Sequence, residues 1–334
     1  MRILLRPRLP VLALLLLAPS IPELLTGSTP VSRVAYDPVG FAVSYVIDIG
    51  LYGTGALLIR EASVVLRKGW ASVLLWGAAY GVAEEGLAVH TFFQRSGSPV
   101  GALASYGSAY GVNGLWALGL TVFHATYSIA LPILLTYLWF PGVRNARWLD
   151  RGSVTLVAGV YLLVVGVFAH LVGHGPTPGL LVVFLGVEAV LLFAGALVPA
   201  DLLRVRQGPP RSGPWGLGLA GSLEWLAWVL VLIGSGSARV PAWGAALVVV
   251  ALNALAVGWV VLRAGSEDLD RSKFAFAVGM LVPLFLWDGI VEVEVPGILA
   301  VAAVFAYLLY RLGRTFERRV GGGDVGASGA AGGS

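Results

Sequence analysis

The sequence predicts an all-α polytopic transmembrane helical bundle, and its composition, its apolar runs and its charge pattern carry this prediction. Hydrophobic residues make up 57% of the 334 residues and charged residues only 12%, against roughly 25% charged residues in soluble domains. Runs of about 20 apolar residues, the length that crosses a bilayer as a helix, recur along the whole chain. We therefore expect an integral membrane protein whose main partner is the lipid bilayer.

About ten spans are expected when the apolar runs are divided at roughly 20 residues per crossing. They fall at 9–26, 40–60, 70–93, 114–140, 153–173, 178–199, 215–234, 240–262, 274–292 and 295–312. Tryptophans mark the ends of many of these runs, as expected of an aromatic belt at the membrane surface. They are Trp70, Trp116, Trp139, Trp215, Trp243, Trp259 and Trp287.

Basic residues separate the spans in alternation, which predicts the orientation. In chain order the basic groups are Arg2, Arg6 and Arg8; Arg60, Arg67 and Lys68; Arg144, Arg147 and Arg151; Arg204, Arg206 and Arg211; Arg263, Arg271 and Lys273; and Arg311, Arg314, Arg318 and Arg319. All of the 22 cations except Arg33, Arg95 and Arg239 lie on one side if the N-terminus is cytoplasmic. By the positive-inside rule, we expect a multi-pass protein of the cell membrane with both termini in the cytoplasm.

Residues 1–319 are expected to form a single integral membrane domain, followed by a flexible cytoplasmic tail at 320–334 (VGGGDVGASGAAGGS). Within the domain, 1–173 contains the polar candidates and 174–319 forms a second helical half. The net charge of +4 follows from the topology, so no nucleic-acid partner is expected. The chain has no cysteine, which excludes disulfides, thiolate metal sites and a cysteine nucleophile.

Glu84 and Glu85 are the strongest site candidates, because they lie inside the apolar run 70–93. A charged residue in a spanning helix costs about 2.5–3.5 kcal/mol on insertion scales and marks a functional site by default. The next span carries a lone His124, and a rise of 1.5 Å per residue puts all three residues in the outer half of the membrane. Glu23, Asp48 and His170 are expected at similar depths.

Helical periodicity assigns faces to these residues. Glu85 shares a stripe with Gly77 and Gly81, so we expect it to face a neighbouring helix, while Glu84 is turned about 100° away. His124 lies on a polar stripe with Asn113, Thr121 and Ser128. We therefore predict that Glu84 or Glu85 comes within hydrogen-bonding reach of His124.

These residue types suit two chemistries. A carboxylate in a dry cavity can act as a general base, with an imidazole as oxyanion donor or metal ligand. His170 and His174 lie at i and i+4, a spacing that can bind a metal, so His124 and His170 are candidate ligands of a divalent metal such as zinc. Adjacent carboxylates also tend to share a proton, which equally suits a proton relay.

The structural alternative is that these polar residues only hold helices together. Glu85 and His124 can be satisfied by interhelical hydrogen bonds without any chemistry. Single polar residues in the second half allow the same interpretation, and no role is assigned to them: Glu188, Glu224 and Asn253.

The Glu84–Glu85 pair, followed by single histidines on later spans, resembles the CPBP family of intramembrane proteases (CAAX proteases and bacteriocin-processing enzymes). The family's EExxxR motif is matched at the two glutamates, with Val89 in the place of the arginine. Its FxxxH motif is matched at His124, with Leu120 in the place of the phenylalanine, and His170 corresponds to the third histidine. Separately, segments such as LLIREA and WGAAYGVAEEGL resemble uncharacterised multi-pass proteins of actinobacteria.

The resemblance implies a Glu/His-dependent intramembrane hydrolase that acts on a membrane-embedded or lipid-proximal substrate. Glu84 or Glu85 would be the base, and His124 the ligand or oxyanion donor. A transporter or proton-coupled carrier that uses the same residues is the alternative, and a non-catalytic membrane scaffold is the third hypothesis.

Overall fold

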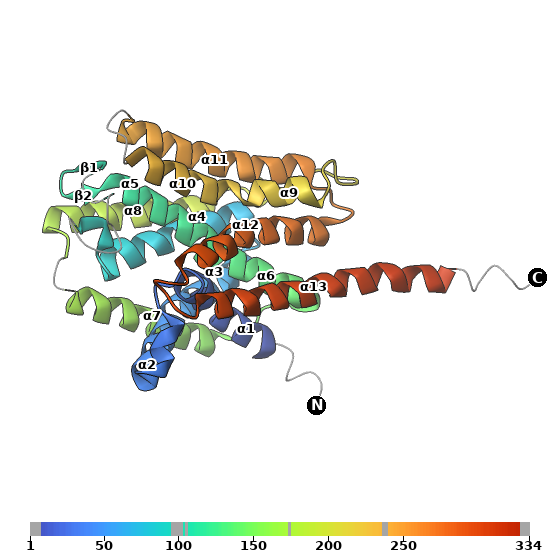
Figure 1. Cartoon of the computed structure of the whole chain (residues 1–334), viewed down its shortest axis with the longest axis horizontal. Coiled ribbons are helices and arrows are strands. Elements are labelled where there is room, and N and C mark those ends of the chain that lie inside the picture. Colours follow the sequence, from blue (N-terminus) through green and yellow to red (C-terminus); the bar gives the residue numbers. More distant parts are fainter. Residues whose placement is uncertain (1–7, 95–102, 104–105, 173–174, 236–239, 328–334) are drawn as a thin grey trace, which may run out of the picture.

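The ten ranges expected as spans are largely helical over the residues that the computed structural model describes, which are 8–94, 103, 106–172, 175–235 and 240–327. The helices lie side by side in a bundle (Figure 1). Within these residues, seven helices are long and apolar enough to cross a membrane. This supports the prediction of an all-α polytopic membrane protein.

The first half consists of helices that are broken into shorter elements. In chain order these are α1 (Arg8–Pro19), η1 (Ser20–Leu24), η2 (Val31–Ala35), α2 (Pro38–Asp48), η3 (Ile49–Gly53), α3 (Thr54–Val65), α4 (Trp70–Val82), η4 (Ala83–Ala88), η5 (Thr91–Phe93), α5 (Gly114–Phe123), η7 (His124–Ala130), α6 (Leu131–Trp139), η8 (Pro141–Val143) and α7 (Arg151–Leu171). The strands β1 (Ser108–Ala109) and β2 (Val112–Asn113) pair as a short antiparallel hairpin before α5.

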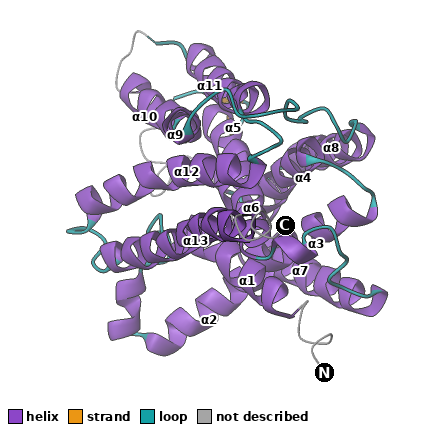
Figure 2. Cartoon of the chain, turned by 90° about the vertical axis from the view of Figure 1, so that its right-hand side faces the viewer, coloured by secondary structure: helices purple, strands orange, loops and turns teal. Residues whose placement is uncertain are grey.

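The second half consists mostly of longer, uninterrupted helices. They are α8 (Pro178–Leu197), α9 (Pro214–Gly221), α10 (Leu223–Ser235), α11 (Ala242–Arg263), α12 (Leu269–Val291) and α13 (Ile298–Ala327). The last helix, α13, extends past Arg319 into the segment that was expected to be a flexible tail. Adding residues to an existing helix requires no new nucleation step. In the end-on view, α9, α10 and α11 form a group at one edge, and α12 lies between this group and α13 (Figure 2).

Local sequence signals explain where several helices begin. Proline occupies the first turn of α2, α8 and α9, where its missing N–H costs no hydrogen bond. Side chains of Asp37, Asp150 and Thr177 cap α2, α7 and α8 by accepting a backbone N–H. At the first of these caps, a hydrogen bond from the Arg33 guanidinium lowers the pKa of the Asp37 carboxyl.

Four π-helical segments interrupt the helices of the first half: η1, η3, η4 and η7. A π-helix closes its hydrogen bonds from residue i to i+5, so each turn holds more residues than an α-helical turn. Pro22 within η1 and Pro132 just after η7 have no N–H to continue the α-helical hydrogen-bond ladder. Such segments occur mostly as single turns inside α-helices and are frequent at functional sites.

The glycine stripe on α4 permits the close helix packing that the sequence predicts. A Cβ atom at Gly77 would lie 2.9 Å from Cα of Ala125, and one at Gly81 would lie 3.0 Å from Cβ of His124. No larger residue fits at this approach without a shift of the backbone. The two glycines therefore allow α4 to lie directly against η7.

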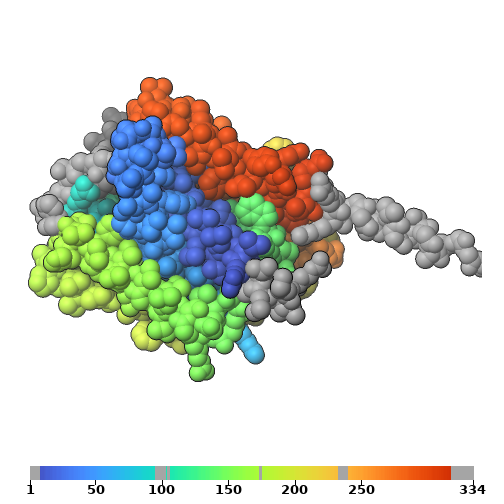
Figure 3. All heavy atoms as spheres, turned by 90° about the horizontal axis from the view of Figure 1, so that it is seen from below, coloured from blue at the N-terminus to red at the C-terminus, as the bar shows by residue number. Residues whose placement is uncertain are grey.

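The two halves share one interior. A cluster of buried apolar residues joins α1, η7 and α6 to α12 and α13. The Tyr127 hydroxyl donates a hydrogen bond to the Met280 carbonyl at 2.9 Å, and Trp76 Nε1 donates to the Leu192 carbonyl at 3.0 Å. Seen from below, α1 and α2 lie between α7 on one side and the C-terminal helices on the other (Figure 3).

The loops that carry the basic groups meet at one end of the bundle. Lys68 Nζ donates to the Val198 carbonyl at 3.1 Å, and the Arg211 backbone N–H donates to the Arg263 carbonyl at 2.7 Å. Arg144 forms an ion pair with Asp270 at 2.8 Å. The start of α1 and the end of α13 lie at this same end (Figure 1).

A buried ion pair fastens this end of α3 to the loop after α6. Arg60 is fully buried and pairs with its neighbour Glu61. Its guanidinium lies 3.5 Å from the centre of the Trp148 ring and donates to backbone carbonyls of Val143, Arg144 and Ala146. Glu61 accepts the Trp148 backbone N–H at 2.9 Å. We call these contacts the Arg60–Glu61 lock.

Removing one partner of the Arg60–Glu61 lock should destabilise the fold more than neutralising both partners. Arg60→Met leaves the Glu61 carboxylate buried without its cation, which we expect to cost about 3–5 kcal/mol of unfolding free energy. The double variant R60M/E61Q removes both charges and keeps an acceptor for Trp148, so it should recover part of this loss. Unfolding of the purified protein in detergent measures both.

The matched control is Arg151→Met, which removes an exposed cation at the same end of the bundle. It should change the unfolding free energy by no more than about 0.5 kcal/mol. A double variant no more stable than Arg60→Met alone would contradict the role assigned to the lock.

Candidate functional site

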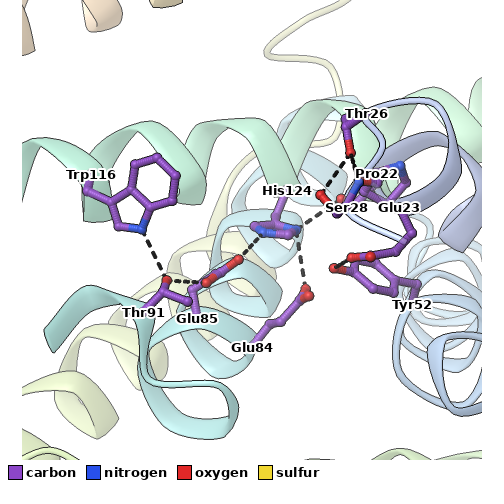
Figure 4. A network of polar contacts seen from close by, with 11 residues as sticks. Pro22, Glu23, Thr26, Ser28, Tyr52, Glu84, Glu85, Thr91, Trp116 and His124 are labelled. Carbon is purple, nitrogen blue, oxygen red and sulfur yellow. Dashed lines mark hydrogen bonds and ion pairs between the residues drawn. The ribbon is translucent and has the colours of Figure 1, made fainter. Parts of the chain in front are cut away.

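Glu84, Glu85 and His124 lie together in the interior of the first half (Figure 4). Glu85 Oε1 is 3.0 Å from His124 Nε2, and Glu84 Oε2 is 3.2 Å from His124 Nδ1. One ligand atom from each residue lies within 4.8 Å of the others. The prediction that a glutamate reaches His124 is confirmed, and we call these three residues the Glu/His cluster.

Glu84 and Glu85 reach the histidine from different sides of its ring. Glu84 Oε2 approaches Nδ1 and Glu85 Oε1 approaches Nε2, which is compatible with the predicted angle between the two side chains. The glycine stripe of α4 then brings both carboxylates up to His124 at the start of η7.

The cluster is buried on all sides. Glu84 and His124 are each 2% exposed and Glu85 is 8% exposed. Glu85 thus faces η7 and not lipid, which confirms the assignment of its face. A charge in this environment costs several kcal/mol unless it is paired, so the carboxylates and the imidazole depend on one another.

Hydrogen bonds extend the cluster toward the loop that follows η4. Thr91 donates its hydroxyl proton to Glu85, and Trp116 Nε1 donates to the Thr91 hydroxyl oxygen at 3.1 Å (Figure 4). On the other side of the ring, His124 Nδ1 is hydrogen-bonded to Ser128 at 2.9 Å. Ser128 lies on the polar stripe predicted for His124. No sequence signal marks Thr91, because it lies six residues after Glu85 and outside the helical face of Glu85.

A second set of polar residues lies beside the imidazole. The Tyr52 hydroxyl donates to Glu23 Oε1 at 2.6 Å, and Thr29 donates to Glu23 Oε2 at 2.9 Å. The Tyr52 and Tyr80 rings both lie with their centres 6.0 Å from the centre of the His124 ring. The depth estimate indicated Glu23. No sequence signal marked Tyr52, because tyrosines are common in helix cores.

Most of the acidic and imidazole groups in this region belong to π-helical segments, whereas Asp48, close to Glu23, is the last residue of α2. Glu23 is on η1, Tyr52 on η3, Glu84 and Glu85 on η4, and His124 on η7. Four interruptions of separate helices therefore meet at one polar centre.

Two polar atoms near the imidazole have no hydrogen-bond partner within the part of the chain that the structure describes. They are Glu84 Oε2 and the Tyr80 hydroxyl. Glu84 Oε2 is close to Nδ1, but Nδ1 is aligned with Ser128, so this close contact is not a hydrogen bond. A buried polar atom without a partner typically binds a water, an ion or a substrate group.

His170 does not join the Glu/His cluster, so the two predicted metal ligands, His124 and His170, do not share one site within the described residues. His170 is exposed on α7 beside a shallow groove formed with Leu162, Leu163 and Gly166. The buried face of α7 is formed by other residues at helical spacing, and His170 lies off this face. These residues are Val157, Tyr161, Val164 and Phe168. His174, the other member of the predicted pair, lies outside the described residues.

The Glu/His cluster fits a divalent metal only in part. One imidazole and two carboxylates supply three donors, the number that a catalytic zinc site uses. However, the two carboxylates face opposite nitrogens of the ring, and one ion can bind only one of these nitrogens. A metal would therefore require the side chains to rearrange, and we derive no chemical step through it.

The single polar residues of the second half lie outside the cluster. Glu224 is 3% exposed and accepts the Thr126 hydroxyl at 2.8 Å, while Asn253 donates to the Val249 carbonyl of its own helix at 3.0 Å. Glu188 on α8 is half-buried and makes no side-chain hydrogen bond or ion pair within the described ranges.

Comparison with known proteins finds no family model, curated protein or solved structure that matches this chain.

Breaking the Glu85–His124 contact should destabilise the protein strongly. Glu85→Leu leaves His124 Nε2 and Thr91 without their acceptor, so we expect a loss of about 3–5 kcal/mol of unfolding free energy. Glu85→Gln keeps an oxygen acceptor and should lose less. Unfolding in detergent, monitored by tryptophan fluorescence, measures both variants.

Glu188→Leu is the control, because it removes a membrane carboxylate that has no partner in the described structure. It should change stability by about 1 kcal/mol or less. If Glu85→Leu and Glu188→Leu lost the same unfolding free energy, the contacts of the Glu/His cluster would make no specific contribution to stability.

Proposed function

We propose that the protein is an intramembrane hydrolase of the Glu/His type, similar to the CPBP proteases, in which Glu84 is the general base. The observation that carries this proposal is the buried Glu84 Oε2, which lies 3.2 Å from His124 and has no hydrogen-bond partner in the described residues. A water bound there would give its proton to Glu84 while its oxygen attacks an acyl carbon; the C–N or C–O bond to the leaving group then breaks, and the leaving group takes that proton from Glu84. The substrate class is a membrane-embedded or lipid-proximal peptide or ester.

The other groups of the cluster have supporting roles in this scheme. Glu85 holds the imidazole through Nε2 and is itself held by Thr91. The Tyr80 hydroxyl lies beside the Glu84 carboxyl, and in this scheme it would donate to the oxygen that becomes negative as water adds. The π-helical segments support the proposal, because such interruptions are frequent at functional sites.

A proton-coupled carrier is the second candidate, and the hydrogen-bonded chain favours it. Thr91, Glu85, His124 and Ser128 form an unbroken series of hydrogen bonds, and Trp116 only donates to Thr91 at its end. Such a series can pass protons between neighbouring groups, and intramembrane Glu and His residues often serve proton relays. A scaffold without chemistry is the third candidate.

Loss of the general base should abolish hydrolysis. Membranes of cells that express the wild type or Glu84→Gln are compared by mass spectrometry of their peptides and lipids. Cleaved species should be present for the wild type and at least about 100-fold reduced for Glu84→Gln, the usual scale of a lost general base. His124→Asn should show the same loss, whereas Glu188→Gln should match the wild type.

Identical cleavage profiles for the wild type and Glu84→Gln would overturn the hydrolase proposal. In that case, pH-gradient dissipation in proteoliposomes separates the remaining candidates. A carrier would move protons and lose this activity in the same variants, whereas a scaffold would not move them.

We also propose ten crossings of the cell membrane with both termini in the cytoplasm. Three spans beyond the seven long apolar helices are needed, and α1 with η1, α4 with η4, and α9 with α10 supply helices in the expected ranges. The meeting of the basic loops at one end of the bundle supports this orientation.

Reporter fusions test this topology. Fusions after Lys68, Arg151 and Arg271 should each report the cytoplasm, because the positive-inside rule keeps these segments there. A fusion after Gly175 should report the opposite side. A non-cytoplasmic signal at any of the first three positions would contradict the ten-span arrangement.

A further inference from the structure

Two cavities adjoin each other between the halves of the protein, away from the Glu/His cluster. One, of about 460 Å³, lies between α4, η7 and α6 of the first half and α9, α11 and α12 of the second, and we call it the apolar cavity. The other, of about 420 Å³, lies beside the ends of α3 and α6, and we call it the basic cavity. Both volumes are in the range of ligand sites in proteins.

The cavities share a wall. Gly69, Trp70, Leu134, Leu269 and Lys273 line both of them. Lys273 lies over the Trp70 ring, with Nζ 5.4 Å from the ring centre. A molecule with two chemically different parts can therefore occupy both cavities at once, passing Trp70 and Lys273.

The basic cavity has an excess of positive charge. Four cations line it, Arg67, Lys68, Arg144 and Lys273, against one carboxylate, Asp270. Asp270 is paired with Arg144, and within the described ranges neither Arg67 nor Lys273 has an ion-pair partner. These cations belong to the basic loops, so the cavity lies at the end of the bundle that we propose to be cytoplasmic.

Arg67 has a backbone conformation that residues other than glycine rarely adopt. Its φ of 52° is in the left-handed region, at the position after a helix where glycine is the usual residue. An arginine there carries a backbone cost that glycine would avoid, and such strain clusters at ligand sites. This observation is independent of the charge count.

The apolar cavity suits a hydrocarbon chain. Along α11 its lining runs from Asn253 to Val261, a length of about 12 Å. The intervening lining residues on this helix are apolar: Ala256, Val257 and Val260. Of the polar lining residues, Glu224 and Thr126 are bonded to each other; apart from Asn253, the others are Asp201, Arg204, Gln207, Ser266 and Lys273.

We propose that these two cavities form one binding site for an anionic membrane lipid, with its phosphate headgroup in the basic cavity and an acyl chain in the apolar cavity. Basic pockets between membrane helices on the cytoplasmic side suit anionic headgroups. This site does not depend on the proposed hydrolase, because the Glu/His cluster lines neither cavity.

Native mass spectrometry of the full-length protein tests the proposal with three probes at equal concentration. Dioleoyl phosphatidylglycerol supplies an anionic headgroup and chains, dioleoyl phosphatidylcholine supplies the same chains without net charge, and glycerol phosphate supplies the anion alone. We expect one phosphatidylglycerol to be retained per protein, and neither of the other probes.

Two variants separate the headgroup from the chain. R67Q/K273M removes two cations that have no ion-pair partner. Each cation contributes about 1 kcal/mol, or about fivefold in affinity, so the double variant should weaken phosphatidylglycerol binding roughly 30-fold. Ala256→Leu fills the apolar cavity from α11 without touching the cations, and should also weaken binding. Arg151→Gln, which removes an exposed cation at the same end outside both cavities, should leave binding unchanged.

Three results would overturn the proposal. If phosphatidylcholine were retained equally, the bound lipid would be a nonspecific annulus. If glycerol phosphate were retained and Ala256→Leu had no effect on it, the site would bind an anion without an acyl chain. If Arg151→Gln lost as much phosphatidylglycerol binding as R67Q/K273M, binding would depend on general surface charge. Should R67Q/K273M fail to fold, Ala256→Leu and the three probes still decide between these outcomes.

Discussion

The imidazole of His124 is held between two carboxylates in the interior of the protein, and much of the first half is arranged around this contact. The ring and both carboxylates are almost completely buried, so each depends on the others for a polar partner. The glycines of α4 bring the helices close enough for the contact, and the two glutamates approach opposite nitrogens of the ring. Thr91, Ser128 and the Tyr52–Glu23 pair then provide the surrounding hydrogen bonds.

The sequence predicts the helices and the centre of the site well, for physical reasons. Apolar length is a sufficient signal for a membrane helix, so the expected spans coincide with helical segments throughout the described chain. A pair of glutamates in such a segment is costly enough to stand out. The stripe of Gly77, Gly81 and Glu85 identified the packing face correctly, because both glycines lie in regular α-helical geometry on α4 and Glu85 follows in η4 on the same side.

The differences from the sequence predictions arise where depth is used without direction and where the chain turns. His170 has a depth similar to that of His124, but it lies off the buried face of α7. Thr91 follows the left-handed residue His90, whose backbone φ of 60° turns the chain back toward Glu85. Local sequence patterns carry little information on such turns.

The Arg60–Glu61 lock has a consequence for the order of assembly during synthesis. Every contact of the lock is made with residues before Leu149, and the hydrogen-bond partners of the Glu/His cluster all precede this point as well. Chains emerge from the ribosome N-terminus first, and early segments can fold before later ones exist. The polar centre can therefore form and be fastened while the helices of the second half are still being translated, which shortens the time that its charges face lipid alone.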